Sequence, residues 1–175
     1  MEKIKNEELG RISVEDFLIT EKIPVIIVLD NVRSAINVGS VFRTADAFRI
    51  SKLYLCGITP TPPHRDIFKS ALGATETVQW EYADTTIKII NQLKQDGFYV
   101  VAIEQTKTSF QLQQFVTADN KKVAIVFGHE MEGVNQEVIN VCDAAVEIPQ
   151  QGTKHSLNIA VCAGIVSWEL FKKYL

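Results

Sequence analysis

A buried strand that runs into a helix is encoded by Val25-Ile-Ile-Val-Leu-Asp-Asn-Val-Arg-Ser-Ala-Ile-Asn-Val-Gly-Ser-Val-Phe-Arg-Thr-Ala-Asp46. Its first five residues form an uninterrupted apolar run, the pattern of a strand that is covered on both faces. Helical composition follows over residues 38–48. Further strands are predicted at 52–56, 98–103, 123–127 and 144–148, and further helices at 85–95, 134–141 and 157–173. Strands that alternate with helices predict an α/β domain on a mostly parallel sheet flanked by helices.

The length of 175 residues, with 46% hydrophobic and 22% charged residues, fits one globular domain. We expect this domain to span residues 23–175, after a short, helical N-terminal extension at residues 1–22. The longest apolar run, Val25–Leu29, is too short to cross a bilayer, and the N-terminus lacks the apolar stretch of a signal peptide. Three isolated cysteines without Cys-x-x-Cys spacing indicate a reducing compartment and predict no metal site. A cytoplasmic protein without a membrane partner is therefore expected.

The net charge of −3 argues against a protein that coats nucleic acid through bulk charge. The distribution is uneven, because residues 31–69 carry a local charge of +4. The basic residues of this segment are Arg33, Arg43, Arg49, Lys52, Arg65 and Lys69, and the acidic ones are Asp46 and Asp66. A solvated polar face explains this segment as well as a nucleic-acid contact does.

Ligands of open parallel sheets bind beyond the carboxyl ends of the strands, which directs attention to loops 30–39, 57–66, 128–133 and 149–156. In the first loop, Arg43 follows Gly39 by four residues. Helical side chains lean toward the N-terminus, so we expect Arg43 to reach back over Asn37 and Gly39, where its guanidinium could grip a phosphate. A surface salt bridge to Asp46 is the alternative.

The loop Phe127-Gly-His-Glu-Met-Glu-Gly133 spaces its glycines as a phosphate-binding P-loop does. Val134 and Asn135 stand where that motif requires Lys and Ser or Thr, so a P-loop is excluded. Glu130 and Glu132 suit a ligand with cationic character or hydroxyl donors instead. An ordinary acidic turn remains the alternative.

The third loop is Glu147-Ile-Pro-Gln-Gln-Gly-Thr-Lys-His-Ser-Leu-Asn-Ile-Ala160. Ser156 is placed to cap the last helix, whose apolar stripe is predicted to comprise Leu157, Ala160, Val161, Gly164, Ile165, Trp168 and Phe171. Ser156 lacks the Gly-x-Ser-x-Gly context of a hydrolase nucleophile, which disfavours hydrolase chemistry.

Together and in this order, the three loops resemble the SpoU (TrmH) family of RNA ribose methyltransferases in the SPOUT superfamily. The family segments are Asn-x-Gly-x-x-x-Arg, Gly-x-Glu-x-x-Gly and Ile-Pro-x-x-Gly-x-x-x-Ser-Leu-Asn. They match Asn37/Gly39/Arg43, Gly128/Glu130/Gly133 and Ile148/Pro149/Gly152/Ser156/Leu157/Asn158. Two positions depart from the family pattern. Gln150 stands where Met is frequent, and Arg49 stands where Gly commonly follows the Ala-Phe pair.

The resemblance implies a SPOUT-like fold with a C-terminal deep trefoil knot, and a homodimer with its active site near the interface. It further implies transfer of a methyl group from S-adenosyl-L-methionine to a ribose 2′-hydroxyl of structured RNA, with tRNA slightly favoured over rRNA. The implied cofactor contacts are Gly128, Ile148 and Leu157, and the implied catalytic residues are Arg43, Asn37, Glu130, Ser156 and Asn158. Arg33, Arg65 and Lys69 are hypothesised to meet RNA phosphates.

Two other functions stay open. One is a non-catalytic RNA-binding module on the same fold, which the complete set of site residues argues against. The other is an α/β enzyme for a small-molecule substrate, which a chain without a second substrate domain makes less attractive.

Overall fold

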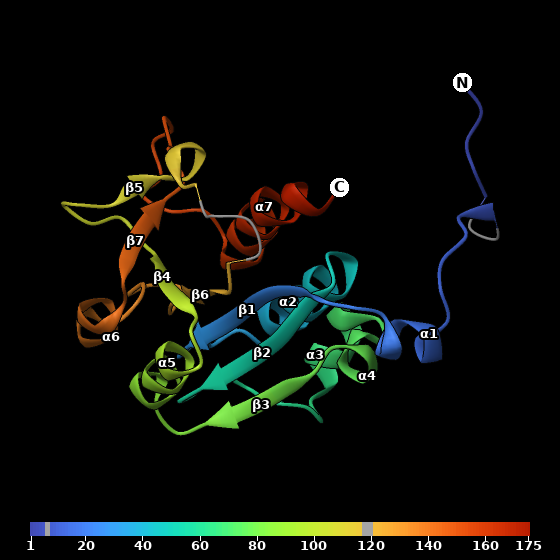
Figure 1. Ribbon diagram of the computed structural model, residues 1–175, viewed down its shortest axis with the longest axis horizontal. Coiled ribbons are helices and arrows are strands. Elements are labelled where there is room, and N and C mark those ends of the chain that lie inside the picture. Colours follow the sequence, from blue (N-terminus) through green and yellow to red (C-terminus); the bar gives the residue numbers. More distant parts are fainter. Residues whose placement is uncertain (6–7, 117–120) are drawn as a thin grey trace.

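A seven-stranded parallel sheet organises the protein, in a computed structural model that describes residues 1–5, 8–116 and 121–175 (Figure 1). The strand order is β3-β2-β1-β6-β4-β7-β5, and every paired neighbour is parallel. The strands are β1 (Ile23–Asp30), β2 (Ile50–Cys56), β3 (Trp80–Ala83), β4 (Tyr99–Ile103), β5 (Phe110–Gln111), β6 (Val123–Phe127) and β7 (Ala144–Glu147). The predicted α/β class with a parallel sheet is confirmed.

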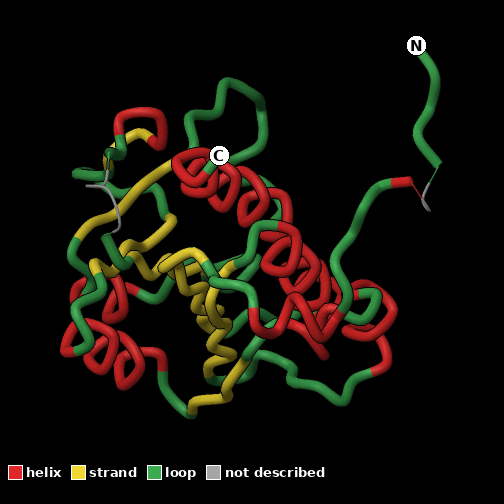
Figure 2. Tube along the Cα trace, turned by 45° about the vertical axis from the view of Figure 1, so that its right-hand side comes forward, coloured by secondary structure: helices red, strands yellow, loops and turns green. Residues whose placement is uncertain are grey.

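Helices cover both faces of the sheet (Figure 2). Those of one core are α2 (Ala35–Ala47), α3 (Arg65–Ala71), α4 (Ala74–Thr77) and α7 (Ile159–Phe171), and those of the other are α5 (Thr86–Gln95) and α6 (Gln136–Val141). Short 3-10 turns lie at Leu112–Gln114 and Lys172–Tyr174. Because both faces are covered, the central strands are apolar throughout, which explains the continuous run in β1.

The predicted strands and helices all exist, with ends that differ by a few residues. No helix or strand is predicted between β2 and α5, where the sequence indicates only the loop 57–66, but this segment contains α3, α4 and the edge strand β3. These three elements have four to seven residues, too few for an apolar period to stand out. The tiny strand β5 was also missed, for the same reason.

The N-terminal extension contains one short α-helix. Within the described part of residues 1–22, the α-helix is limited to α1 (Val14–Ile19), capped by Ser13. The described residues before it extend away from the rest of the molecule in both views (Figures 1 and 2). Residues 6 and 7 belong to the predicted extension and lie outside the described residues.

The apolar stripe predicted for the last helix lies mostly on its exposed side. The helix α7 turns Ile159, Ala163, Val166, Ser167 and Leu170 into the core. Val161 is 52% exposed and Trp168 is 45% exposed. Nearly every position of α7 is apolar or small, so its sequence contains two apolar faces and the period alone does not decide which one is buried.

The unusual Arg49 has a backbone explanation. It follows the C-cap of α2, Phe48, and has φ +52°, a left-handed conformation that glycine adopts most easily. This chain therefore places an arginine in the backbone conformation for which the family pattern has glycine. The departure lies at a helix end and leaves α2 intact.

Gly39 serves helix packing. A Cβ on Gly39 would lie 2.4 Å from the carbonyl oxygen of Ile67 and 2.1 Å from Oγ of Ser70, both in α3. The motif glycine of α2 thus lets α3 approach closely, and it faces α3 rather than a ligand.

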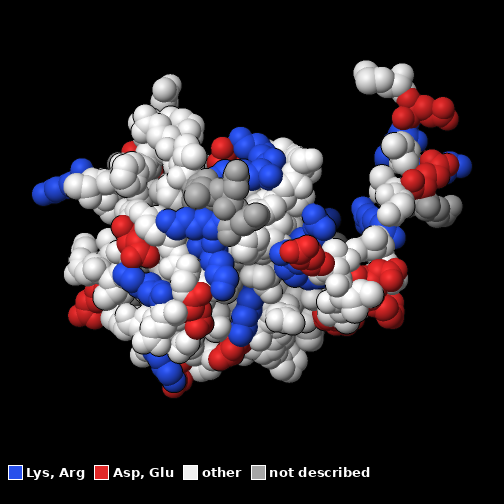
Figure 3. All heavy atoms as spheres, in the orientation of Figure 1, with Lys and Arg blue, Asp and Glu red and all other residues white. Residues whose placement is uncertain are grey.

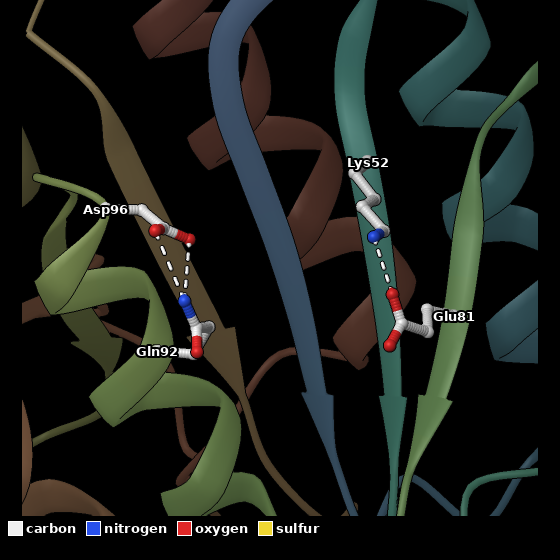
Figure 4. Close-up of polar contacts among 4 residues, drawn as sticks. All are labelled: Lys52, Glu81, Gln92 and Asp96. Atoms are coloured by element: carbon white, nitrogen blue, oxygen red, sulfur yellow. Dashed lines mark hydrogen bonds and ion pairs between the residues drawn. The ribbon is translucent and has the colours of Figure 1, made fainter.

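The edge strand β3 and its neighbour β2 are joined by an ion pair as well as by their backbones (Figure 4). Lys52 of β2 and Glu81 of β3 form an ion pair of 2.7 Å across the face of the sheet. On α5, the side-chain amide of Gln92 donates to the carboxylate of Asp96.

Lys and Arg lie among Asp and Glu over the face shown in Figure 3, in keeping with a small net charge. Among the helices that the structure describes, none is both long and apolar enough to cross a membrane.

Candidate active site

A cavity of about 460 Å³ opens at the carboxyl ends of β4, β6 and β7. Its size is in the range of small-molecule and cofactor sites. The lining comes from the ends of these strands and from the loops that follow them: Ile103, Glu104, Gln105, Phe127, Gly128, His129, Glu130, Met131, Glu132, Gly133, Glu147, Ile148, Gln150, His155, Ser156, Leu157, Asn158, Ile159 and Cys162. The second and third predicted loops therefore meet in one cavity.

The two glycines of the second loop are required by its tight closure. The backbone of His129 and the backbone of Gly133 exchange hydrogen bonds of 3.0 and 2.8 Å. A Cβ on Gly128 would lie 2.1 Å from the carbonyl carbon of Gly133. Gly133 itself has φ +71°, and a Cβ there would meet the carboxylate of Glu104. The glycine spacing thus fits a closed turn in which the backbone forms one wall of the cavity.

Glu130 points from this turn toward the start of α2. Its carboxylate accepts hydrogen bonds from the backbone N–H of Arg33 at 3.0 Å, from that of Ser34 at 2.9 Å, and from Nδ2 of Asn37 at 3.0 Å. Burial opposes its ionisation, but these hydrogen bonds outweigh burial and lower the pKa of Glu130. An ionised carboxylate therefore bridges β6 and α2.

Asn37 extends this bridge to the third loop. Its Oδ1 accepts a hydrogen bond of 3.2 Å from Nδ2 of Asn158. Oδ1 of Asn158 accepts from the backbone N–H of Ala160 at 2.9 Å and so caps α7. The prediction that Ser156 caps this helix is wrong, because the helix starts two residues later. Ser156 is exposed and lines the cavity instead.

Two residues at the end of β4 complete the cavity. Oε2 of Glu104 accepts from the backbone N–H of Val134 at 3.0 Å, and Nε2 of Gln105 donates to the carbonyl of His155 at 2.8 Å. They hold the second and third loops in place. The loop after β4 was absent from the four loops selected from the sequence, although its position at a strand's carboxyl end was a signal that could have found it.

Arg43 does not line the cavity, which corrects the expectation that it reaches back over Asn37 and Gly39. Arg43 follows Asn37 by six positions, so at 3.6 residues per turn the two residues lie on different faces of α2. Gly39 is covered by α3, whereas Arg43 is exposed, as is Ile36. Arg43 and Asp46 form no ion pair, and the Asp46 carboxylate accepts a hydrogen bond from Oγ1 of Thr77. Arg33, Arg65 and Lys69 are exposed as well.

The cysteines are free thiols, and Cys162 lines the cavity. Burial raises the pKa of Cys162 to about 11, so this thiol stays protonated at neutral pH and is a poor nucleophile. Burial likewise raises the pKa values of Cys56 and Cys142 to about 12. Within the described residues, His, Cys, Asp and Glu form no group of three or more suited to a metal ion.

A parallel α/β sheet with a cavity built from the loops after β6 and β7 describes a class of ligand-binding domain, and the comparisons give its family. Residues 24–168 match the model of the SpoU rRNA Methylase family. The chain belongs to this family. The resemblance drawn from the three motifs is therefore confirmed.

Two relatives of similar sequence are named as RNA methyltransferases. A Staphylococcus aureus protein assigned to the TrmH family of tRNA/rRNA methyltransferases is 30% identical over 153 residues, which cover 87% of this chain and 60% of the relative. The 23S rRNA (guanosine-2′-O-)-methyltransferase RlmB of Vibrio vulnificus is 27% identical over 169 residues, covering 97% of this chain and 67% of the relative. The chain thus spans about three fifths of the length of the staphylococcal protein.

Solved structures agree with this placement. The A. aeolicus TrmH/SpoU tRNA modifying enzyme superposes with a TM-score of 0.81 at 26% identity, over 91% of this chain and 80% of that one. An AdoMet-bound rRNA methyltransferase from Sinorhizobium meliloti superposes with a TM-score of 0.82 at 28% identity, over 89% and 58%. The fold is therefore that of known RNA-modifying enzymes.

We expect Glu130→Gln to lower the free energy of unfolding by about 1 to 3 kcal/mol at neutral pH, because hydrogen bonds to a charged acceptor are lost. The lowered pKa of Glu130 gives the sign of the pH effect. The contribution of the ionised Glu130 side chain to the free energy of unfolding is complete above the unfolded-state pKa of about 4.3. This contribution is lost as pH falls through the lower folded-state pKa. Urea titrations at neutral and acid pH should show the difference from the wild type shrinking in acid.

The control for this experiment is Glu132→Gln, two residues along the same loop. Glu132 is exposed, and within the described residues its carboxylate accepts no hydrogen bond. We expect its stability to stay close to that of the wild type. Equal losses in the two variants would contradict a bridging role for Glu130.

Proposed function

We propose that this protein transfers a methyl group from S-adenosyl-L-methionine to a ribose 2′-hydroxyl of structured RNA. The observation that carries the proposal is the hydrogen-bonded chain Glu130–Asn37–Asn158, which joins the three motif segments beside one cavity. The AdoMet-bound structure from Sinorhizobium meliloti and the guanosine-2′-O-methyltransferase of Vibrio vulnificus support the same reaction class.

The cavity suits this cofactor in size and composition. Gly128, Ile148 and Leu157 line it and would hold the cofactor, with backbone groups of the loops available for the adenine. Apolar side chains such as Phe127 and Ile159 supply surface for the ring. When bound, S-adenosylmethionine supplies an electrophilic methyl group on a sulfonium. Gln150 lines the cavity, so the family's frequent Met is replaced at a cofactor contact.

The reacting ribose enters from the exposed side of the cavity, where Ser156 and Asn158 lie. Glu130 and Asn37 fix the position of Asn158 and so shape this entrance. Arg43 acts on the RNA through its guanidinium. Since arginine effectively stays protonated in proteins, it orients a phosphate and stabilises charge developing on the attacking oxygen, rather than removing the proton.

We further propose that the protein works as a homodimer through the exposed side of α7. Val161, Ile165 and Trp168 form an exposed apolar stripe on this helix, and Leu157, just before it, is exposed as well. The ring of Trp168 lies 5.9 Å from that of Phe48 at the end of α2, so the stripe continues toward α2. Arg43 lies on the exposed face of α2, where a second copy would bring it near a cavity entrance.

The C-terminal trefoil knot belongs to the same proposal. The loop between β7 and α7 is held from two sides, by Gln105 through His155 and by Asn37 through Asn158. This position is consistent with a C-terminal segment passed through a loop of the chain. An experimental structure in which residues 148–158 pass over the neighbouring loops, rather than through one, would contradict the knot.

A non-catalytic RNA-binding module on this fold is the alternative. It would retain the cavity and the RNA surface but transfer no methyl group. The intact set of Asn37, Arg43, Glu130, Ser156 and Asn158 favours catalysis. The target is expected among tRNA and rRNA, and the site of action in the cytoplasm.

The first prediction concerns the reaction. Incubation with labelled S-adenosylmethionine and cellular RNA should yield a 2′-O-methylated nucleoside after digestion. Arg43→Ala should lose at least about 100-fold in transfer, because positioning and charge stabilisation in the transition state are lost. Cofactor affinity should change less than twofold by calorimetry, since Arg43 lies outside the cavity. Equal loss of cofactor binding would refute this role, and cofactor binding without transfer in the wild type would favour the binding module.

The second prediction concerns the dimer. Val161→Glu places a charge on the exposed stripe and should convert the protein into a monomer in sedimentation velocity. Ile19→Glu is the matched control, because Ile19 is 85% exposed and belongs to α1. A monomeric wild type, or a dimer that survives Val161→Glu, would contradict the proposed interface.

The third prediction concerns the RNA contacts. We propose that Arg33, Arg65 and Lys69 meet phosphates, so the double charge reversal Arg65→Glu and Lys69→Glu should weaken RNA binding about 10-fold or more at low salt. It should also flatten the dependence of binding on salt concentration. Lys88→Glu on α5 is the control, because α5 covers the opposite face of the sheet. An unchanged salt slope in the double variant would count against these contacts.

A further inference from the structure

The charges around the cavity have one sign. Four carboxylates line it, from Glu104, Glu130, Glu132 and Glu147, and no Lys or Arg occurs among its described lining residues. Besides the carboxylates, two histidines, His129 and His155, line the cavity. The cavity is thus strongly acidic, in a protein whose total charge is only −3.

Three of these carboxylates are held in place by hydrogen bonds. Glu104 accepts backbone hydrogen bonds from Val134 at 3.0 Å and Gln105 at 2.9 Å. Glu130 accepts three, which keep its pKa low. Glu147 accepts a hydrogen bond of 3.1 Å from Oγ of Ser109. Each of these bonds fixes the position of the carboxylate that accepts it.

All four carboxylate charges act electrostatically on a ligand bound in the cavity. A cavity of about 460 Å³ is about 10 Å across, so a charge inside it lies about one Debye length or less from every wall. The amino-acid end of S-adenosylmethionine carries one positive and one negative charge, and the adenosine is neutral. The sulfonium is therefore the unbalanced charge of the cofactor, and it disappears when the methyl group leaves and a thioether remains.

We propose that the four carboxylates make this pocket selective for the cationic sulfonium of the cofactor over the neutral thioether product. This inference rests on the proposed function, because it concerns the ligand of the same site. The loss of charge on methyl transfer then weakens binding of the product and promotes its exchange for fresh cofactor. Glu132 and Glu104 are the specificity-determining residues that can be changed without breaking the bridge made by Glu130.

Calorimetric titration tests the proposal with three nucleosides. They are S-adenosylmethionine, S-adenosylhomocysteine, and sinefungin, which carries an amine where the cofactor has its sulfonium. The wild type should bind the two cationic nucleosides more tightly than S-adenosylhomocysteine, and raising salt from about 50 to about 500 mM should narrow the gap. Glu132→Gln and Glu104→Gln should each weaken the cationic nucleosides about 3- to 10-fold and S-adenosylhomocysteine less than twofold.

Glu137→Gln serves as the control, because Glu137 is exposed on α6 and does not line the cavity. Its three affinities should match those of the wild type. Equal weakening of all three nucleosides in Glu132→Gln, or a wild type that binds S-adenosylhomocysteine as tightly as the cofactor, would overturn the charge selectivity while leaving the proposed function intact. Failure of all three nucleosides to bind the wild type would overturn the proposed function as well.

Discussion

The rest of the site depends on the hydrogen bonds that the carboxylate of Glu130 accepts. It gathers two backbone N–H groups that precede α2 and the side-chain amide of Asn37, and through Asn37 it reaches Asn158 at the start of α7. Glu130 is thereby joined to Asn37, which lies 93 residues away in the sequence, and Asn37 is joined to Asn158, which lies 121 residues away. A charged acceptor is suited to this task, because hydrogen bonds to it are stronger than those between neutral groups.

The parallel sheet makes this convergence possible. Its strands all end at the same edge, so the loops after β4, β6 and β7 can share one cavity. Close approach then demands small residues. Gly128 and Gly133 allow the second loop to close on itself, and Gly39 allows α3 to lie against α2. The family glycines thus serve backbone and helix packing, and two of them, Gly128 and Gly133, also line the cavity.

The charge pattern separates two tasks within one small domain. The cavity is acidic, whereas Arg33, Arg43, Arg65 and Lys69 are exposed outside it. An acidic pocket favours a cationic cofactor, and separated basic side chains favour a polyanion that approaches from outside. Arg43 is not among the residues that line the cavity. Under the proposed function, RNA, a second copy of the protein, or both bring Arg43 to the reacting ribose.

Sequence patterns by themselves determined the α/β class, the main strands and helices, and the three motif segments, because apolar period, strand ends and glycine spacing are local properties. Only the tertiary structure decided which face of α7 is buried, since both of its faces are apolar, and that Asn158 rather than Ser156 caps it. It also placed Arg43 away from Asn37 and brought Glu104 and Gln105 into the site. These outcomes depend on which elements pack together across the sheet, and contacts between residues far apart in the chain leave no periodic trace in the sequence.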